Sequence, residues 1–356
     1  MKILFLGQAP EGNQSTKHRV QFLANELESR GHDCSVCPGK SRELYGRILN
    51  HVSVRGVWRL SKGGAEFDAV VINRGASPLS KLAVIAARQK GVPTIFDIDD
   101  ALWRNRHISG TRIPNPAAIH LDSIFSEVNA VAAGNKQTMD YVRRHDGTPF
   151  YAPTPVNRDI FHSDYEPPRD YDKIVLGWMG NGPVHVSNLS TLVAPLKRLG
   201  EEYDIRFRMI SSLGDESIHQ MFSNVETNVD IDYGFSSWEP METIAAEMAT
   251  FDIALLPLNS SDEFMEGKTA MKVFEHLAVG VPVVATDFGA YRNVLSDGET
   301  GMLVDGPDDW YTTVSTLIED RRRRSNLAKR GEDFVEEYTV KAFADRYEEV
   351  LVDLDS

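Results

Sequence analysis

The chain has 356 residues, 42% of them hydrophobic and 25% charged, which predicts a globular protein with two cores of about 150 residues each. The formal net charge of -14 argues against a nucleic-acid-binding surface. Two cysteines, Cys34 and Cys37, are too few for a disulfide scaffold, and we expect them to pack near the end of the second strand. Because the chain has no run of ~18 apolar residues and no signal-peptide pattern, we expect a cytoplasmic protein.

Short apolar runs alternate with helical stretches from the amino terminus onward. Helices are expected at 16–30 and 80–90, closed by Gly31 and Gly91, because glycine favours the end of a helix. This alternation predicts a doubly wound α/β domain over residues 1–160. Its buried strands are expected at 2–6, 69–72, 93–96 and 128–132.

The loop after the first strand, GQAPEGNQSTKHRV, carries a candidate acceptor site. Lys17, His18 and Arg19 lie at a predicted helix start, where they are suited to bind a phosphate group on an acceptor. The alternative is an ordinary helix start capped by Ser15.

A basic segment spans residues 39–64. It contains six Lys or Arg residues and one acid, interleaved with apolar and aromatic residues. In so acidic a chain, this composition predicts a peripheral contact with an anionic membrane. Helices packed on the sheet with solvated basic edges are the alternative.

Three aspartates follow the strand at 93–96, in the string FDIDDALW. Ligands of such sheets bind beyond the carboxyl ends of strands, so Asp99 or Asp100 is a candidate base for the acceptor hydroxyl. A metal site on the D-x-D string is the alternative. We expect no metal.

The alternation restarts after a proline-rich, acidic connection and predicts a second doubly wound domain over residues 170–336. A final helix is expected over 341–354. The strands of this domain are expected at 174–178, 205–210, 225–231, 253–257, 281–286 and 301–304.

The segment 251–305 is the most informative part of the chain. A helix is expected from near Lys268 to Gly280, with Lys268, Lys272 and Glu275 along one stripe. Lysines at a helix amino terminus suit a diphosphate, and Glu275 suits ribose hydroxyl groups. The alternative is a solvated face with a weak charge pair.

The strings FEHLAVGVPVVAT and SDGETGMLV in this segment resemble the donor-binding half of family 4 of the GT-B glycosyltransferases. AGNKQTMDYV, APTPVNRDIF and LGWMGNG are similar to this family too. The resemblance implies two Rossmann-like domains facing across a cleft, with residues 340–356 crossing back to the first. It also implies retaining transfer of a sugar from a nucleoside diphosphate sugar to a hydroxyl group of a glycan or lipid-linked acceptor, without a metal.

The chain departs from the family pattern at three places. Gly267 stands where relatives often have a glutamate, and Asp262, Glu263 or Glu266 is an alternative source of that carboxylate. Asp99 replaces a histidine. The loop after 174–178 lacks the phosphate-binding arginine and lysine, so we assign the diphosphate to Lys268, Lys272, the helix end and the backbone at Gly180. We expect Lys268 to act in catalysis by neutralising the charge that develops on the diphosphate.

These departures leave two other functions open. One is a catalytically silent subunit that binds nucleotide sugar or a partner transferase. The other is a nucleotide-sugar epimerase of related architecture. Within the transferase reading, the pathway expected is synthesis of a surface glycan or glycolipid.

Overall fold

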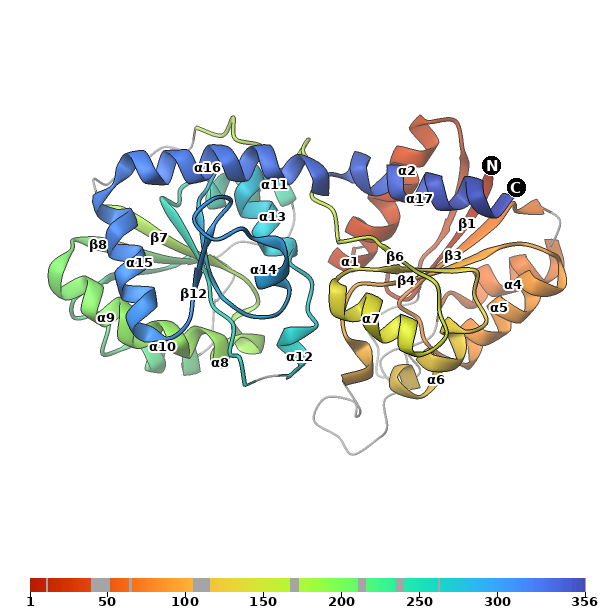
Figure 1. The fold of residues 1–356 in the computed structure, drawn as a ribbon, viewed down its shortest axis with the longest axis horizontal. Coiled ribbons are helices and arrows are strands. Elements are labelled where there is room, and N and C mark those ends of the chain that lie inside the picture. The colour runs from red at the N-terminus through yellow and green to blue at the C-terminus, as the bar shows by residue number, and fades with distance from the viewer. Residues whose placement is uncertain are drawn as a thin grey trace. The chain divides into compact units, whose positions relative to one another are not determined.

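The structure is a computed structural model that describes residues 1–10, 12–39, 52–63, 66–104, 116–166, 173–210, 216–234, 240–261 and 263–355. It divides into two compact units (Figure 1). The first unit comprises Met1–Pro155, Gly267–Thr269 and Tyr338–Ser356, and the second comprises Val156–Glu266 and Ala270–Glu337.

The first unit is built on a six-stranded parallel sheet in the order β2-β1-β3-β4-β5-β6. Its strands are β1 (Lys2–Gly7), β2 (Asp33–Cys37), β3 (Ala69–Asn73), β4 (Thr94–Ile98), β5 (Ala130–Ala133) and β6 (Pro149–Tyr151). Its helical elements are α1 (Gln14–Thr16), η1 (Lys17–Gln21), α2 (Phe22–Ser29), α4 (Val54–Gly63), α5 (Pro78–Gln89), η3 (Leu102–Arg104), α6 (Pro116–Phe125), α7 (Lys136–Arg144) and α17 (Val340–Asp355).

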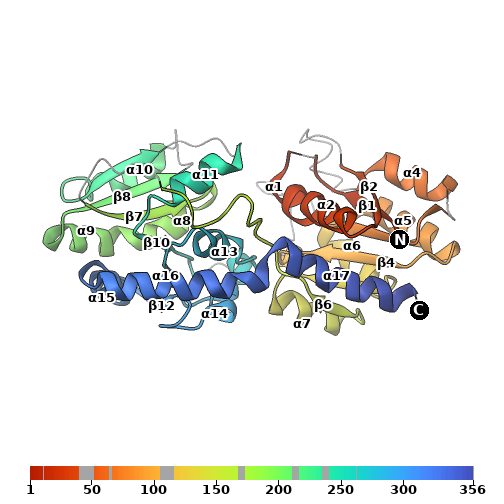
Figure 2. The same ribbon diagram turned by 90° about the horizontal axis from the view of Figure 1, so that it is seen from above.

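Side chains of this sheet alternate between two cores, as the period of a strand requires. Leu4 and Leu6 of β1 belong to a core shared with α4, α5 and α6. Ile3 and Phe5 belong to a core on the other face, shared with α2 and α17. Figures 1 and 2 show helices on both faces of the sheet. Both faces are covered, which explains why the strands are continuous apolar runs.

The second unit also has a six-stranded parallel sheet, in the order β12-β11-β10-β7-β8-β9. Its strands are β7 (Ile174–Met179), β8 (Ile205–Ile210), β9 (Asp230–Gly234), β10 (Ile253–Leu256), β11 (Val283–Thr286) and β12 (Met302–Val304). Its helical elements are η4 (Gly182–Val184), α8 (Val186–Leu189), η5 (Ser190–Leu192), α9 (Val193–Glu202), α10 (Glu216–Phe222), α11 (Met241–Met248), α12 (Glu263–Glu266), α13 (Met271–Ala278), α14 (Gly289–Val294), α15 (Pro307–Glu319), α16 (Arg321–Val335) and η6 (Glu336–Tyr338).

Two doubly wound α/β units confirm the predicted fold class, and most strands lie within one or two residues of their predicted bounds. Three predictions of elements were incomplete or wrong. The strand expected at 225–231 begins only at Asp230, because Val225 and Val229 are buried in a turn after α10. The helix expected from Lys268 begins at Met271. The edge strand β6 was not predicted.

Each sheet has a point where the chain reverses the direction in which it adds strands. In the first unit this point lies between β1 and β3, and in the second between β7 and β10. Ligands of open α/β sheets bind at such points, beyond the carboxyl ends of the strands. The candidate site residues of each unit lie in the loops at these ends.

Candidate functional site

In the second unit, Lys272 extends from the first turn of α13 toward the carboxyl end of β7. Its ammonium group lies 4.9 Å from the centre of the Trp178 ring and 3.5 Å from His185 Nε2. A Cβ at Gly180 would lie 2.5 Å from Lys272 Nζ and 2.7 Å from the Trp178 ring, so a larger residue would require the lysine or the ring to move. Lys272, Trp178, His185 and Gly180 therefore lie together at the β7–β10 reversal point, with the ammonium group of Lys272 among them.

The backbone N–H of Gly180 does not lie open to a ligand. It donates to the carbonyl oxygen of Ile210 at 3.3 Å. The prediction that this N–H binds a phosphate is wrong in this structure, because the group already has a partner in the neighbouring strand. What Gly180 supplies is space for Lys272.

Glu275 lies one turn after Lys272, with 3% of its surface exposed. Burial raises the pKa of this carboxyl group to about 8, and nearby Lys272 lowers it only in part. The alternative of a solvated helix face with a weak charge pair is therefore wrong. The carboxyl group is mostly protonated at neutral pH, so it can both donate and accept hydrogen bonds.

His276, next to Glu275, is also buried. Burial lowers the pKa of its imidazole to about 4, so the ring is neutral near pH 7. Its Nδ1 lies 2.7 Å from the carbonyl oxygen of Lys272, to which a neutral ring can donate. This bond fixes the ring against the first turn of α13, the turn that carries Lys272.

Lys268 does not belong to α13. It lies in the segment Gly267–Thr269, which is grouped with the first unit. There the N–H of Thr269 donates to Asp100 Oδ1 at 3.1 Å. The expected stripe of Lys268, Lys272 and Glu275 along one helix is therefore wrong, because the helix begins three residues later than predicted.

The absence of a glutamate at Gly267 has a steric reason in the first unit. A Cβ at this position would collide with the Cβ of Ala101. Its carbonyl oxygen accepts hydrogen bonds from the Ala101 N–H and the Asn135 amide, each at 3.0 Å. Of the carboxylates considered as replacements, Asp262 lies outside the described residues.

Asp99 and Asp100 lie together at the carboxyl end of β4, and both are buried. Arg74, which directly follows β3, forms ion pairs with both carboxylates: Nε lies 3.1 Å from Asp99 Oδ1, and Nη2 lies 3.1 Å from Asp100 Oδ2. Arg74 Nη1 also donates to Ser15 Oγ at 3.2 Å. Loops after three strands thus meet at one guanidinium group.

The backbone of Arg74 is in the left-handed region, with φ of 58°. Residues other than glycine rarely adopt this conformation, and it tends to occur at functional sites. The conformation is supported by a hydrogen bond from the Arg74 N–H to the carbonyl oxygen of Asp97 at 2.9 Å. It turns the chain sharply at the end of β3, where the side chain meets the two aspartates.

Asp100 has the electrostatic properties of a proton acceptor. Burial is the main cause that raises the pKa of its carboxyl group above the usual value, and the charge of Asp99 raises it further. Arg74 and Lys268 act in the opposite direction. A carboxylate with a raised pKa is a stronger base near neutral pH than an ordinary aspartate.

Arg19 was predicted to bind an acceptor phosphate, and the structure contradicts this. Its guanidinium group is fully buried and forms a bidentate pair with Asp97, with Nε–Oδ1 and Nη2–Oδ2 distances of 2.8 Å. It also donates to Thr154 Oγ1 at 3.0 Å and to the carbonyl oxygen of Ala152 at 2.9 Å. Four of its five N–H groups are therefore used inside the first unit.

His18 is also fully buried, and its Nδ1 lies 3.1 Å from the carbonyl oxygen of Pro155. Both side chains point inward because they fall on the packed side of η1, whereas Lys17 is only half-buried. The helix is capped by Asn13, whose Oδ1 accepts from the Ser15 N–H, so Ser15 is not the cap. Of the predicted basic cluster, only Lys17 remains as a candidate acceptor ligand.

The Asp97 carboxylate also accepts a hydrogen bond from the Tyr347 hydroxyl group of α17, and one from Asn73 Nδ2 at 2.7 Å. Because Asp97 is occupied in this way, the alternative of a metal site on the D-x-D string is contradicted. Among the described residues, no three His, Cys, Asp or Glu side chains are placed to bind a metal ion. Independence from metal stays a prediction.

Cys34 and Cys37 lie in β2, near the position expected, and are free. Burial raises the pKa of the Cys34 thiol to about 12, which keeps it protonated. Within the described ranges, no helix has the length and apolarity needed to cross a membrane. Of the basic segment 39–64, residues 40–51 and 64 lie outside the described residues.

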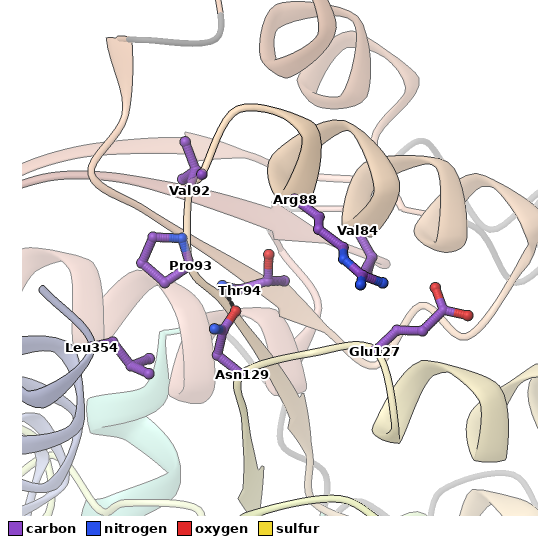
Figure 3. Close-up of a pocket in the computed structure, with 9 residues that line it drawn as sticks. Val84, Arg88, Val92, Pro93, Thr94, Glu127, Asn129 and Leu354 are labelled. Atoms are coloured by element: carbon purple, nitrogen blue, oxygen red, sulfur yellow. Dashed lines mark hydrogen bonds between the residues drawn. The ribbon is translucent and has the colours of Figure 1, made fainter.

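A pocket of about 250 Å³ lies at the amino ends of strands β4 and β5 of the first unit (Figure 3). It is lined by Thr94 at the start of β4 and by Asn129 just before β5, joined by a hydrogen bond of 2.9 Å. Because ligands bind beyond the carboxyl ends of such strands, this pocket is not the candidate site.

Sequence reasoning missed Arg74, Trp178 and His185. A search of strand ends would have found Arg74, since it is the first residue after β3. Trp178 is the penultimate residue of β7, and His185 follows a glycine-rich loop, so neither forms a motif with Lys272. Their meeting depends on the strand order, which brings β7 next to β10.

Comparison with known proteins gives one family. Residues 173–320 match the family model described as glycosyl transferases group 1. A D-inositol 3-phosphate glycosyltransferase from Corynebacterium efficiens is 37% identical over 114 residues, which cover 32% of this chain and 25% of that protein. An enzyme of the same name from Stackebrandtia nassauensis is 24% identical over 295 residues. That alignment covers 74% of this chain and 63% of the relative, so the chain spans less than two thirds of either protein's length.

Solved structures share the fold over the whole chain. Sucrose-phosphate synthase from Thermosynechococcus elongatus gives a TM-score of 0.74 at 13% identity, over 99% of this chain and 98% of that one. Anabaena HepE, solved in complex with UDP, gives 0.73 at 15% identity, over 99% and 100%. The two six-stranded parallel sheets are those of the GT-B fold.

Proposed function

We propose that the protein transfers a sugar from a nucleoside diphosphate sugar to a hydroxyl group. The premise is that residues 173–320 make the chain a member of the glycosyl transferases group 1 family. The acceptor is a glycan or a lipid-linked molecule, and the anomeric configuration is retained. The pathway that such a reaction serves is synthesis of a surface glycan or glycolipid, with a peripheral contact between residues 39–64 and the membrane.

The observation that carries this proposal is the position of Lys272. Its ammonium group lies at the β7–β10 reversal point, against the Trp178 ring and the space left by Gly180. A diphosphate bound here would meet this charge and the amino end of α13 together. The cation then stabilises the negative charge that develops on the leaving diphosphate as the glycosidic bond breaks.

Glu275 is proposed as the contact to the ribose of the donor. As a carboxyl group with a pKa of about 8, it can donate to one hydroxyl group and accept from another at neutral pH. Ribose and diphosphate are adjacent groups of one nucleotide, so Lys272 and Glu275, which lie one turn apart on α13, can each contact one of them.

For the acceptor, we assign Asp100 as the base, with Asp99 and Arg74 setting its charge. The proton of the attacking hydroxyl group passes to this carboxylate while the new bond forms on the face that the diphosphate leaves. Lys17 supplies positive charge for any anionic group on the acceptor, and Lys268 keeps its expected role of stabilising the charge on the leaving diphosphate. No metal takes part in this proposal.

The test is calorimetry of the full chain with uridine, guanosine, adenosine and thymidine diphosphates and their sugars, with and without a divalent cation. UDP comes first, since a structural neighbour was solved with it. We expect one nucleotide to bind without metal, and Lys272→Met to weaken binding by about tenfold or more. The control is Lys197→Met, an exposed lysine on α9.

Two results would contradict the proposal. If no nucleotide binds, the silent subunit is the better reading of the chain. If the bound donor sugar is converted to another sugar without any acceptor, the chain is an epimerase. Release of a sugar to water or to an acceptor hydroxyl group, detected by mass spectrometry, supports the transferase.

A further inference from the structure

Exposed apolar side chains gather on two neighbouring helices of the first unit. Six large hydrophobic residues are exposed in the part of the chain that the structure describes, and four of them lie on α4 and α5. These four, here called the α4–α5 face, are Val54 (58% exposed), Trp58 (58%), Leu82 (56%) and Ile85 (43%).

The two helices present these side chains on the same side. Val57 and Leu60 of α4 and Val84 of α5 are buried in one core, on one face of the sheet. Since both helices turn their inner sides to this face, their outer sides point the same way. Lys90, after α5, donates to the carbonyl oxygens of Leu60 and Ser61 at 2.7 Å, which ties the ends of the helices together. Figures 1 and 2 both show α4 beside α5.

The charge of these helices is opposite to that of the whole chain. They contain no Asp or Glu, in a chain of formal net charge -14, and five Lys or Arg residues: Arg55, Arg59, Lys62, Lys81 and Arg88. Arg59 lies 3.8 Å from Glu66, which offsets one of these charges. Lys62 lies 5.1 Å from the centre of the Trp58 ring, so a cation borders the apolar surface itself.

We propose that the α4–α5 face binds the headgroup region of an anionic lipid bilayer. An exposed apolar patch bordered by cations has the two features of a protein surface that lies on such a membrane. The extreme charge contrast with the rest of the chain selects an anionic partner over a neutral one. The inference deepens the membrane contact of the proposed function by adding α5, which lies outside the basic segment 39–64.

Each kind of side chain has a separate part in this binding. Trp58 and Leu82 enter the interface, where an amphipathic tryptophan ring is favoured. Lys62 keeps its apolar stem near the acyl chains and its ammonium group at the phosphates. Orientation follows from this: the sheet face covered by α4 and α5 turns to the lipid, and the face covered by α17 turns away.

The experiment is sedimentation of the full chain with vesicles of phosphatidylglycerol and phosphatidylcholine in equal parts, compared with phosphatidylcholine alone. Neither donor nor acceptor is present, so failure of the proposed function leaves this measurement unaffected. We expect binding to the anionic vesicles only, weakened about tenfold or more in Trp58→Ser with Leu82→Ser. Lys62→Glu lowers binding about fivefold, and added salt lowers it further.

A second readout is the tryptophan emission, which shifts to shorter wavelength on the vesicles and loses this shift in Trp58→Phe. The matched control is Val352→Ser, an equally exposed valine of α17 at 58%. Equal binding by the two-serine variant and the wild type would overturn the inference. So would self-association of the wild type without vesicles that the same variants abolish, because the face would then bind a second copy of the chain.

Discussion

The two units place charge at the carboxyl ends of their sheets in different ways. In the first unit, Arg74 is paired with Asp99 and Asp100, above a second buried pair of Arg19 and Asp97. In the second unit, the cation Lys272 lies against an aromatic ring and an imidazole, beside a carboxyl group that burial keeps protonated.

The charges of the first unit therefore hold its loops in a fixed arrangement, whereas those of the second unit suit the binding of an anion. Paired charges in the first unit hold loops from different strands in place, and a base among them has a set pKa. In the second unit, Lys272 lies in the first turn of α13, where a bound anion would meet its charge together with the amino end of the helix. The first arrangement suits proton transfer, and the second suits a diphosphate.

The largest effect is expected from Arg19→Met, which tests whether the lower pair in the first unit is structural. Removing the guanidinium group leaves Asp97 buried without its main partner, and we expect a loss of about 3–5 kcal/mol in the free energy of unfolding. The thermal midpoint of the first unit should fall by about 10 °C. Lys17→Met, two residues earlier, is the control. An unchanged midpoint with weaker acceptor binding would instead restore Arg19 as an acceptor ligand.

Glu275→Gln tests the protonated carboxyl group of the second unit. Its pKa is raised from 4.5 to about 8, so between these values the folded state binds a proton that the unfolded state has lost. The stability of the wild type relative to the glutamine variant therefore falls as pH rises through this window, by at most about 5 kcal/mol. Thermal midpoints of both proteins between pH 5 and pH 9 measure it. Exposed Glu201→Gln is the control, and a difference that does not change with pH would contradict burial of the carboxyl group.

Arg74→Gln sharpens the comparison at the proposed base. Arg74 lowers the pKa of Asp100, so its removal raises that pKa and moves the acidic limb of the pH–rate profile to higher pH. We expect a shift of about one to three pH units. Arg74→Lys keeps a charge and should shift the limb less. Loss of rate at every pH with an unmoved limb would mean that Asp100 is not the base.

The smallest effect is expected from Trp178→Phe, which weakens the aromatic support of Lys272. A smaller ring binds a cation less strongly, so donor affinity should fall about two- to fivefold in calorimetry. The thermal midpoint, measured in parallel, reports any cavity left in the core. If affinity is unchanged at an equal midpoint, the contact between Lys272 and the ring does not set donor binding.

Sequence patterns predicted the sheets well because strands buried on both faces are continuous apolar runs, as at residues 3–6 of β1 and in β11. They also placed Asp99 and Asp100 correctly at the end of a strand, since a strand end is visible in sequence. Val225 and Val229 led to a strand being predicted too early, because a turn can bury valines as a strand does. Arg19 misled for a related reason: adjacent basic residues suggest one cluster, but the helix turns Arg19 inward and leaves Lys17 half-exposed. The ion pairs of Arg74 with Asp99 and Asp100 depend on a left-handed backbone, and the contacts of Lys272 depend on strand order. Neither can be predicted from a local sequence pattern.

The place of α17 in the first unit has a consequence for how the protein is made. Phe343 and Tyr347 complete a core whose other helices come from the start of the chain, and Tyr347 donates to Asp97. During synthesis, the ribosome must therefore finish the entire second unit before the first can close its core. Until then, the nascent first unit displays the apolar surface that α17 later covers.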